Sequence, residues 1–271
     1  MVHQNILKVA RIIRNNPKFE MLSRFGYITN GILHTLIGIA IIALALGASE
    51  EVDQSGVLVP LAHSWYGFIL LILIVIGLVS LGIWQIVRAL VMRKEPHADR
   101  KWPHQLSELA KGLAYIALGL TSLTYIFANA GFSSSVSQTQ SFAAHLLTLP
   151  LGQVLLGIIG VLIAALGANF MYRGISRRFL KSLHENKIKF SKTITVLGCI
   201  GYCAKGLTFL LVGFLFFQAA LNRNPGQASG LDGAFRTLLG LPLGTVLVCI
   251  LGIGFIVYAV YCVARGRYGK L

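Results

Sequence analysis

Long apolar runs alternate with short polar segments along most of this chain of 271 residues. A run can cross a bilayer if it supplies ~20 residues of helix, because the hydrocarbon core is about 30 Å thick. The first two predicted spans are Phe25–Gly47 and Tyr66–Leu90, and the last two are Val196–Leu221 and Gly244–Ala264. These four runs predict helices that lie in lipid rather than in water.

The middle of the chain contains two further spans. Residues 112–172 have no Lys, Arg, Asp or Glu, and this stretch is too long for one helix. The polar run Gly131–Ser141 divides it, which predicts span three at Leu109–Ala130 and span four at Gly152–Tyr172. The expected fold class is an all-α integral membrane protein with six transmembrane helices.

Two glycine patterns recur three times in the same order. In spans one, three and five, two glycines lie seven residues apart, and in spans two, four and six a glycine precedes an arginine by 21 residues. A period of roughly 80 to 95 residues indicates three copies of one unit. The predicted repeats are 25–95, 108–180 and 196–271. The glycine pairs are Gly31 and Gly38, Gly112 and Gly119, and Gly206 and Gly213; the glycine–arginine pairs are Gly67 and Arg88, Gly152 and Arg173, and Gly244 and Arg265.

Basic residues fix the expected orientation. Of the 24 Lys and Arg residues, only Arg223 and Arg236 fall in the loops after spans one, three and five. Because basic residues stay on the cytoplasmic side, both termini are predicted to be cytoplasmic. The N-terminal segment 1–24 is predicted to be a basic, amphipathic helix on the membrane surface. Each repeat then enters and leaves on one side, so the repeats are parallel and a pseudo-threefold arrangement is the simplest closed packing.

The composition narrows the possible partners. Only 12% of the residues are charged and the mean hydropathy is +0.73, so a soluble globule is excluded. The net charge of +15 comes from short segments between spans, which argues against nucleic-acid binding. We expect the basic side to contact anionic lipids at the cytoplasmic face of the bilayer, and a membrane-protein partner is a further possibility.

The repeated positions have structural interpretations. The glycine pairs Gly31 and Gly38, Gly112 and Gly119, and Gly206 and Gly213 each lie on one helix face, where small residues let helices approach closely in lipid. Exposure of this backbone to a ligand is the alternative. Arg88, Arg173 and Arg265, with Lys111 and Lys205, close the cytoplasmic ends of spans. They are predicted to anchor at headgroups, or alternatively to form a basic ring at the mouth of a cavity.

One histidine lies inside a span. His34 is a candidate intramembrane polar site, because ionisable residues in spans are often functional. The corresponding positions hold Tyr115 and Phe209, so packing of a ring, or a hydrogen bond between helices, is the favoured interpretation.

The remaining candidate chemistry is sparse. The outer loops carry Asp53 and Asp232 before short segments that are predicted to form capping helices. Together with His63 and His145 they could meet on the outer face, which leaves an enzyme acting on lipid as a third hypothesis. The sequence holds no recognised catalytic motif. No cofactor and no metal are expected, since the cysteines Cys199, Cys203 and Cys262 have no histidine at ligand spacing.

The repeat motifs resemble a known bacterial family. They are Gly26-Tyr27-x-x-x-Gly31 and Gly201-Tyr202-x-x-Lys205-Gly206, Asp53-Gln54-Ser55-Gly56-x-Leu58 and Gly230-Leu231-Asp232-Gly233-Ala234, and Ala264-Arg265-x-Arg267-Tyr268. This wording is similar to that of the three-repeat membrane proteins of domain of unknown function 1206. Repeat two departs from it, because it lacks the Gly-Tyr pair. The resemblance implies a bacterial inner-membrane protein and carries no established activity.

Two functions from different classes follow as hypotheses. The leading one is a non-enzymatic interaction or accessory protein in the membrane, because most repeated positions have a packing or anchoring explanation. The alternative is a small-solute channel or transporter with its path along the pseudo-threefold axis.

Overall fold

The computed structural model describes residues 17–49, 51–62, 64–92, 102–127, 135–183 and 191–269, and in these ranges the regular elements are helices. Most of the predicted N-terminal surface helix lies outside the described residues. Helix α2 already begins at Pro17, so the last part of the basic segment 1–24 is continuous with the first apolar run.

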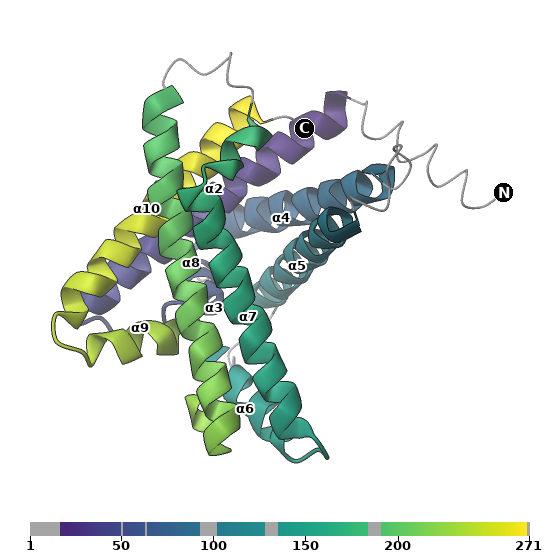
Figure 1. Cartoon of the computed structure of the whole chain (residues 1–271). Helices are drawn as coiled ribbons and strands as arrows, with labels where there is room; N and C mark the ends of the chain where they lie inside the picture. The colour runs from purple at the N-terminus through teal and green to yellow at the C-terminus, as the bar shows by residue number, and fades with distance from the viewer. Residues whose placement is uncertain are drawn as a thin grey trace. The chain divides into compact units, whose positions relative to one another are not determined.

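Each repeat consists of a long helix, a short helix and a second long helix (Figure 1). The long helices differ from the predicted spans mainly by extra turns at their ends, where polar residues continue the helix beyond the apolar run. The first helices of the repeats are α2 (Pro17–Ala45), α5 (Trp102–Phe127) and α8 (Ser191–Asn222), and the second helices are α4 (Trp65–Met92), α7 (Gly152–Ile175) and α10 (Gly244–Tyr268).

The short helices lie where the outer loops were expected to form caps. They are α3 (Gln54–Ala62), α6 (Ser135–Leu147) and α9 (Leu231–Leu239), with two 3-10 turns at η2 (Arg178–Ser182) and η4 (Pro225–Gln227). Asp53 starts α3 as an N-cap, because its Oδ1 accepts a hydrogen bond of 2.8 Å from the Gly56 amide. Asp232 lies in the first turn of α9, where a carboxylate complements the helix dipole.

Five of the long helices are long and apolar enough to cross a membrane: α2, α4, α7, α8 and α10. The chain is therefore a multi-pass membrane protein. Helix α5 is not among these five, although predicted span three covers most of it. Its first turns hold Glu108 and Lys111, and residues 128–130 at the other end of that span are outside the described part.

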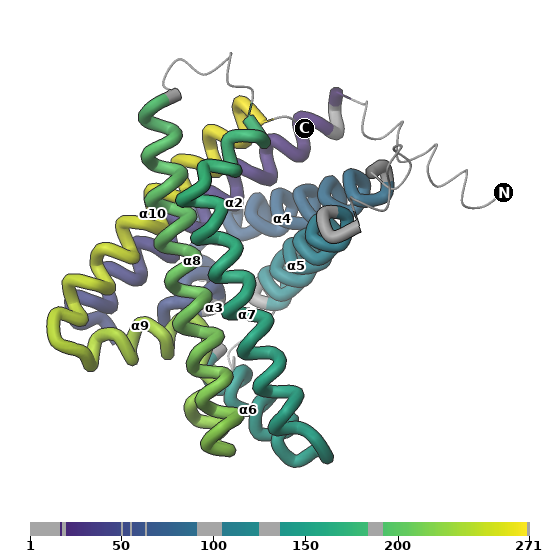
Figure 2. The backbone as a smooth tube through the Cα atoms, viewed as in Figure 1, coloured from purple at the N-terminus to yellow at the C-terminus, as the bar shows by residue number. Residues whose placement is uncertain are grey.

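The chain divides into two compact units. The first consists of Met1–Gly31, Leu61–Phe127 and Cys262–Leu271, and the second of Ile32–Pro60 and Ala128–Tyr261. Helices α4 and α5 belong to the first unit, and α7, α8 and the short helices α6 and α9 belong to the second. Figure 2 shows the backbone of both pairs, α4 with α5 and α7 with α8, as tubes that run side by side.

A small apolar core holds α6, α7, α8 and α9 together within the second unit. Leu156 of α7, Ala143 of α6 and Ala219 of α8 are completely buried in it. Ala234 of α9 and Ala228, which follows η4, also lie in this core. Alanines on three of these helices permit close approach of the short helices to the long ones.

Glycines make the seams between the long helices. A Cβ atom placed on Gly206 of α8 would lie 2.8 Å from the carbonyl oxygen of Gly167 on α7, much closer than non-bonded atoms approach. Equivalent seams join Gly213 to Gly160, Gly112 of α5 to Gly82 of α4, and Gly38 of α2 to Gly252 of α10, with built distances of 2.7 to 2.9 Å. Gly119 lies against Val79 of α4, and Gly31 is buried in α2.

These seams follow one rule. The first helix of each repeat packs on the second helix of the preceding repeat: α5 on α4, α8 on α7, and α2 on α10. Five of the six predicted helix-packing glycines thus lie at contacts between repeats: Gly38, Gly112, Gly119, Gly206 and Gly213.

A second set of seams lies within a repeat. In the first unit a Cβ atom on Gly26 of α2 would lie 2.9 Å from Leu81 Cβ on α4. In the second unit Gly201 of α8 lies equally close to Tyr258 of α10. Gly26 and Gly201 are the glycines of the two Gly-Tyr pairs, so this motif supplies a close contact between the two long helices of its own repeat.

The glycine of the glycine–arginine pattern has a separate cause. Gly152 and Gly244 begin α7 and α10, and Gly67 is the third residue of α4. A Cβ atom on any of them would collide with the carbonyl oxygen of the residue six positions earlier. Only glycine leaves room for the short helix to turn back into the long one. In repeats two and three this turn also places a leucine in the left-handed region, with φ of 66° at Leu151 and 62° at Leu243.

Candidate functional site

The first unit contains a buried carboxylate surrounded by basic groups. Glu108 of α5 is only 3% exposed, and its Oε1 accepts a hydrogen bond of 2.6 Å from the Lys111 ammonium. The guanidinium groups of Arg88 on α4 and Arg265 on α10 also interact electrostatically with Glu108. Basic side chains from all three repeats therefore act electrostatically on one carboxylate, and we call Arg88, Glu108, Lys111 and Arg265 the charged cluster.

Aromatic and amide groups hold one side of the charged cluster in place. Arg265 lies over the ring of Tyr27, with its Cζ atom 4.6 Å from the ring centroid. The Tyr27 hydroxyl in turn accepts a hydrogen bond of 3.2 Å from Nε2 of Gln85. Both Tyr27 and Gln85 are buried, so the Arg265 guanidinium lies against side chains that are themselves held by packing.

Tyr27 and Glu108 are equivalent positions in the repeat, four residues before Gly31 and Gly112. Repeat one supplies a ring there, and its neighbour is Arg265. Repeat two supplies a carboxylate, and its neighbour is Arg88. The arginines at the ends of α4 and α10, Arg88 and Arg265, thus each interact with this position in the next repeat.

The third arginine of the pattern behaves differently. The Nε atom of Arg173 donates a hydrogen bond of 3.2 Å to Oδ1 of Asn169, one turn earlier on the same exposed surface of α7. The structure therefore does not give the three arginines one environment. Arg88 and Arg265 belong to the charged cluster, and Arg173 lies along its own helix.

The second unit contains a basic pair among aromatic rings. The Lys205 ammonium of α8 lies 2.8 Å from Nε2 of His34 on α2, and His34 is 7% exposed. The same ammonium lies 4.6 Å from the ring centroid of Tyr258 and 5.3 Å from that of Phe170. Electron-rich ring faces attract a cation, so the rings and His34 together accommodate Lys205 inside the helix bundle.

His34 is also held by its ring. It stacks on Phe255 at a centroid distance of 5.9 Å and lies 4.9 Å from the ring of Tyr258. The ring-packing and hydrogen-bond roles that the sequence suggests are therefore combined in one side chain. Lys205 and Lys111, which were expected to extend toward headgroups, each contact a polar protein group instead.

The aspartates of the outer loops have structural contacts. In the second unit Asp232 Oδ1 accepts a hydrogen bond of 3.0 Å from the Val52 amide, and its Oδ2 lies 2.7 Å from Nε of Arg236. Arg236 also donates to the carbonyl of Ser49. This network joins α9 to the segment before α3. His145 lies in the last turn of α6, and His63 is outside the described residues, so the enzyme hypothesis stays a prediction.

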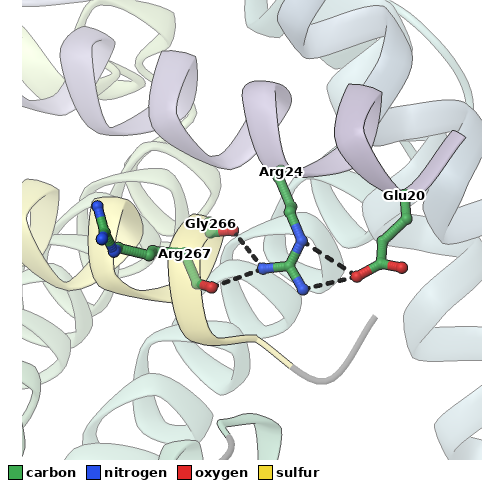
Figure 3. Close-up of polar contacts among 4 residues, drawn as sticks. All are labelled: Glu20, Arg24, Gly266 and Arg267. Atoms are coloured by element: carbon green, nitrogen blue, oxygen red, sulfur yellow. Dashed lines mark hydrogen bonds and ion pairs between the residues drawn. The ribbon is translucent and has the colours of Figure 1, made fainter. Parts of the chain in front are cut away.

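Arg24 makes a contact that the sequence did not reveal (Figure 3). Its guanidinium donates 2.8 and 2.7 Å hydrogen bonds to the carbonyl oxygens of Gly266 and Arg267 at the end of α10. Two further hydrogen bonds join the same group to Glu20 Oε1, one turn earlier on α2. The last carbonyls of a helix have no partner within the helix, and Arg24 supplies one.

Several functional candidates were therefore missed from the sequence. Glu108 belongs to the charged cluster, and Tyr27 and Gln85 support its Arg265, although none of the three was singled out as a site residue. One signal was present for Glu108: it is the only acidic residue between Trp102 and Phe127, on the same helix as predicted span three. A lone acid three residues before a lysine at the edge of a span favours a buried ion pair.

Comparison with known proteins identifies the family. Three segments, 25–91, 107–177 and 200–269, match the family described as Domain of Unknown Function (DUF1206), and they fall on the three predicted repeats. The chain belongs to this family of three-repeat proteins, as its motifs indicated.

One curated relative covers almost the same length. The chain is 27% identical over 257 residues to "Uncharacterized protein YxxB" of Bacillus subtilis (strain 168), which spans 93% of this chain and 92% of that protein. No solved structure matches the chain.

Proposed function

We propose that the chain is a six-span protein of the bacterial inner membrane with both termini in the cytoplasm, and that it acts as a non-enzymatic interaction or accessory protein. The sixth span is α5. Its residues after Lys111 are apolar and carry no charge, and the repeat places it where α2 and α8 stand in the other repeats. The distribution of Lys and Arg supports the orientation.

The observation that carries the role is the use of the repeated residues. Gly38, Gly112, Gly206 and Gly213 lie at seams between repeats, and Gly67 and its equivalents form the turns into the second helices. The glycines of the internal repeat pattern thus lie where helices come into close contact. Because the repeated positions serve helix packing, they favour the role of a scaffold that presents surfaces within the membrane.

Helix α7 is the least buried of the five apolar helices. Only 17% of its most apolar 18-residue stretch is buried, against 50 to 56% in the other four. Its outward residues are aliphatic, with Val161 55% and Leu162 59% exposed. This supports contact with lipid or with a helix of another membrane protein.

Co-purification tests the proposed role. The tagged full-length protein is extracted in a mild detergent from its native membrane, and bound proteins are identified by mass spectrometry. We expect a membrane protein that is retained by wild type and by Ile253→Trp on α10, but reduced by Val161→Trp on α7. The two positions are equally exposed, at 53% and 55%. A strictly monomeric protein that retains no partner contradicts the proposal.

A solute path is the second candidate, because a specific observation favours it. Lys205 and His34 place two basic groups inside the helices of the second unit, and ionisable groups within spans commonly mark ion or solute pathways. Anion flux into proteoliposomes tests this candidate. Loss of flux in Lys205→Met, with flux kept in Arg173→Gln, supports a path; an absence of flux in wild type removes it.

A further inference from the structure

The charged cluster of the first unit carries an excess of positive charge. Arg88, Lys111 and Arg265 supply three cations, and Glu108 supplies one carboxylate. One oxygen of that carboxylate already accepts from Lys111. The chain as a whole has 24 basic and nine acidic residues, so the imbalance at the cluster has the same sign as that of the entire molecule.

The cluster is also accessible. Arg88 and Arg265 are half-buried, and the Lys111 side chain is 34% exposed, whereas Glu108 is buried. Basic groups from three helices thus act on a buried carboxylate and are themselves partly exposed. Two planar guanidinium groups and one ammonium are the donors that phosphate oxygens prefer.

The cluster is prearranged rather than a chance gathering of basic side chains. Arg265 is held over the Tyr27 ring, and Tyr27 is held by Gln85. Lys111 is held by its hydrogen bond to Glu108. The contrast with Arg173, which occupies the same repeat position and donates to Asn169 on its own helix, shows that the repeat pattern alone does not create such a cluster.

We propose that the charged cluster binds a phosphate-bearing anion, either the headgroup of an anionic lipid or free inorganic phosphate. In this arrangement Arg88 and Arg265 contact the phosphate oxygens, and Glu108 positions Lys111 beside them. The lipid source rests on the proposed orientation, which places the ends of α4 and α10 in the cytoplasmic leaflet, where anionic headgroups attract basic groups. Glu108 limits the affinity, because its carboxylate competes with the ligand for the same cations.

Native mass spectrometry of the full-length protein tests the site. The protein in mild detergent is mixed with phosphatidylglycerol or phosphatidylcholine, and in a separate arm its thermal midpoint is measured with inorganic phosphate against sodium chloride of equal ionic strength. Preferential retention of phosphatidylglycerol indicates the lipid source. Stabilisation by phosphate without a lipid preference indicates the free anion. If wild type shows neither a preference for phosphatidylglycerol nor stabilisation by phosphate, the proposal is overturned.

Matched variants locate the bound anion. Arg88→Gln and Arg265→Gln should each weaken binding of the anion, measured by whichever arm responds in wild type, by about fivefold. This is the effect expected for one basic group near a membrane surface. Arg173→Gln, the same change at the equivalent repeat position, should leave it unchanged. Glu108→Gln should raise anion binding, because the amide oxygen can still accept a hydrogen bond from Lys111 while the competing negative charge is removed.

Equal losses in all three arginine variants would mean diffuse attraction to the basic surface, and they overturn the site. A weaker response in Glu108→Gln than in wild type, in protein that elutes as a single species in size-exclusion chromatography, overturns it as well. The wild-type arms decide the proposal even where a variant does not fold. Failure here leaves the co-purification result untouched, so the two proposals fail separately.

Discussion

Gly206 on α8 faces Gly167 on α7 so closely that a Cβ atom on Gly206 would lie 2.8 Å from the Gly167 carbonyl oxygen. Gly112 and Gly82 have the same relationship between α5 and α4. These two pairs occupy equivalent repeat positions, one in each unit. Because lipid provides no hydrophobic drive for helix association, close backbone packing of this kind supplies much of what holds the helices together.

Replacement of Gly206 by alanine should therefore destabilise the protein. The new methyl group would lie 2.5 Å from Cγ of Met171 and 2.7 Å from the Met171 amide nitrogen, so α7 and α8 must separate. Overpacking of this kind costs about 1 to 3 kcal/mol. Thermal unfolding in detergent measures the change. Gly157→Ala on α7 is the control, because its nearest neighbour, Ala220 Cβ, is 3.7 Å from the built atom. Equal midpoints for the two variants would show that the seam is not tightly packed.

The same conservative substitution should have opposite consequences at two arginines. Arg173 makes one exposed hydrogen bond on its own helix, so Arg173→Lys, and even Arg173→Ala, should leave folding and the thermal midpoint nearly unchanged. Arg24 forks onto Glu20 and two carbonyls of α10, and an ammonium cannot reproduce that planar contact. Arg24→Lys should lower stability by about 1 to 2 kcal/mol. A larger loss of stability at Arg173 than at Arg24 would contradict the contacts described for both arginines.

The contact between His34 and Lys205 should appear as a coupling energy. His34→Phe retains the ring that repeats two and three have at this position, but it removes the hydrogen bond to Lys205. Lys205→Met removes the same contact from the other side. Groups in direct contact usually show coupling of about 0.5 to 3 kcal/mol in a double-mutant cycle. Unfolding of the two single variants and the double variant measures it, and simple additivity would mean that the hydrogen bond contributes nothing.

Asp232 should control the order of the segment before α3. Asp232→Ala leaves the buried Val52 amide without its acceptor and Arg236 without its ion pair. A loss of about 1 to 3 kcal/mol is expected for an unsatisfied buried donor. Hydrogen exchange followed by mass spectrometry should show faster exchange around Val52. Asp53→Ala removes the cap of α3, worth about 1 kcal/mol, and should speed exchange at Gly56 more than at Val52. The reverse pattern would count against the Asp232 network.

The sequence predicted the repeats and the helices well because both depend on local signals. Apolar runs gave the long helices, and the glycine spacings gave the three copies, whose family is now identified. Helix ends were less predictable, since α2 begins at Pro17 and α8 at Ser191. The polar residues there do not belong to an apolar run, yet they continue the helix.

The site was less predictable because its contacts join different repeats. Arg265 and Tyr27 are far apart in the sequence, and no local pattern connects them. Glu108 was overlooked because repeats one and three have tyrosine at that position, so a comparison of repeats treated it as a departure from the pattern. The partners of Arg88 and Arg265 follow only once it is known that the first helix of each repeat packs on the second helix of the repeat before it.

We propose that the protein has three parallel repeats in the membrane, with the short helices on the outer face and both termini in the cytoplasm. Labelling of single cysteines in intact cells with a membrane-impermeant maleimide tests it most directly, in a background without the four native cysteines. Cysteines at Gln138 in α6 and Thr237 in α9 should react before lysis, and a cysteine at Ser176 after α7 should react only after lysis. Equal labelling of Gln138→Cys and Ser176→Cys in intact cells would contradict the account, because α7 would not cross the membrane.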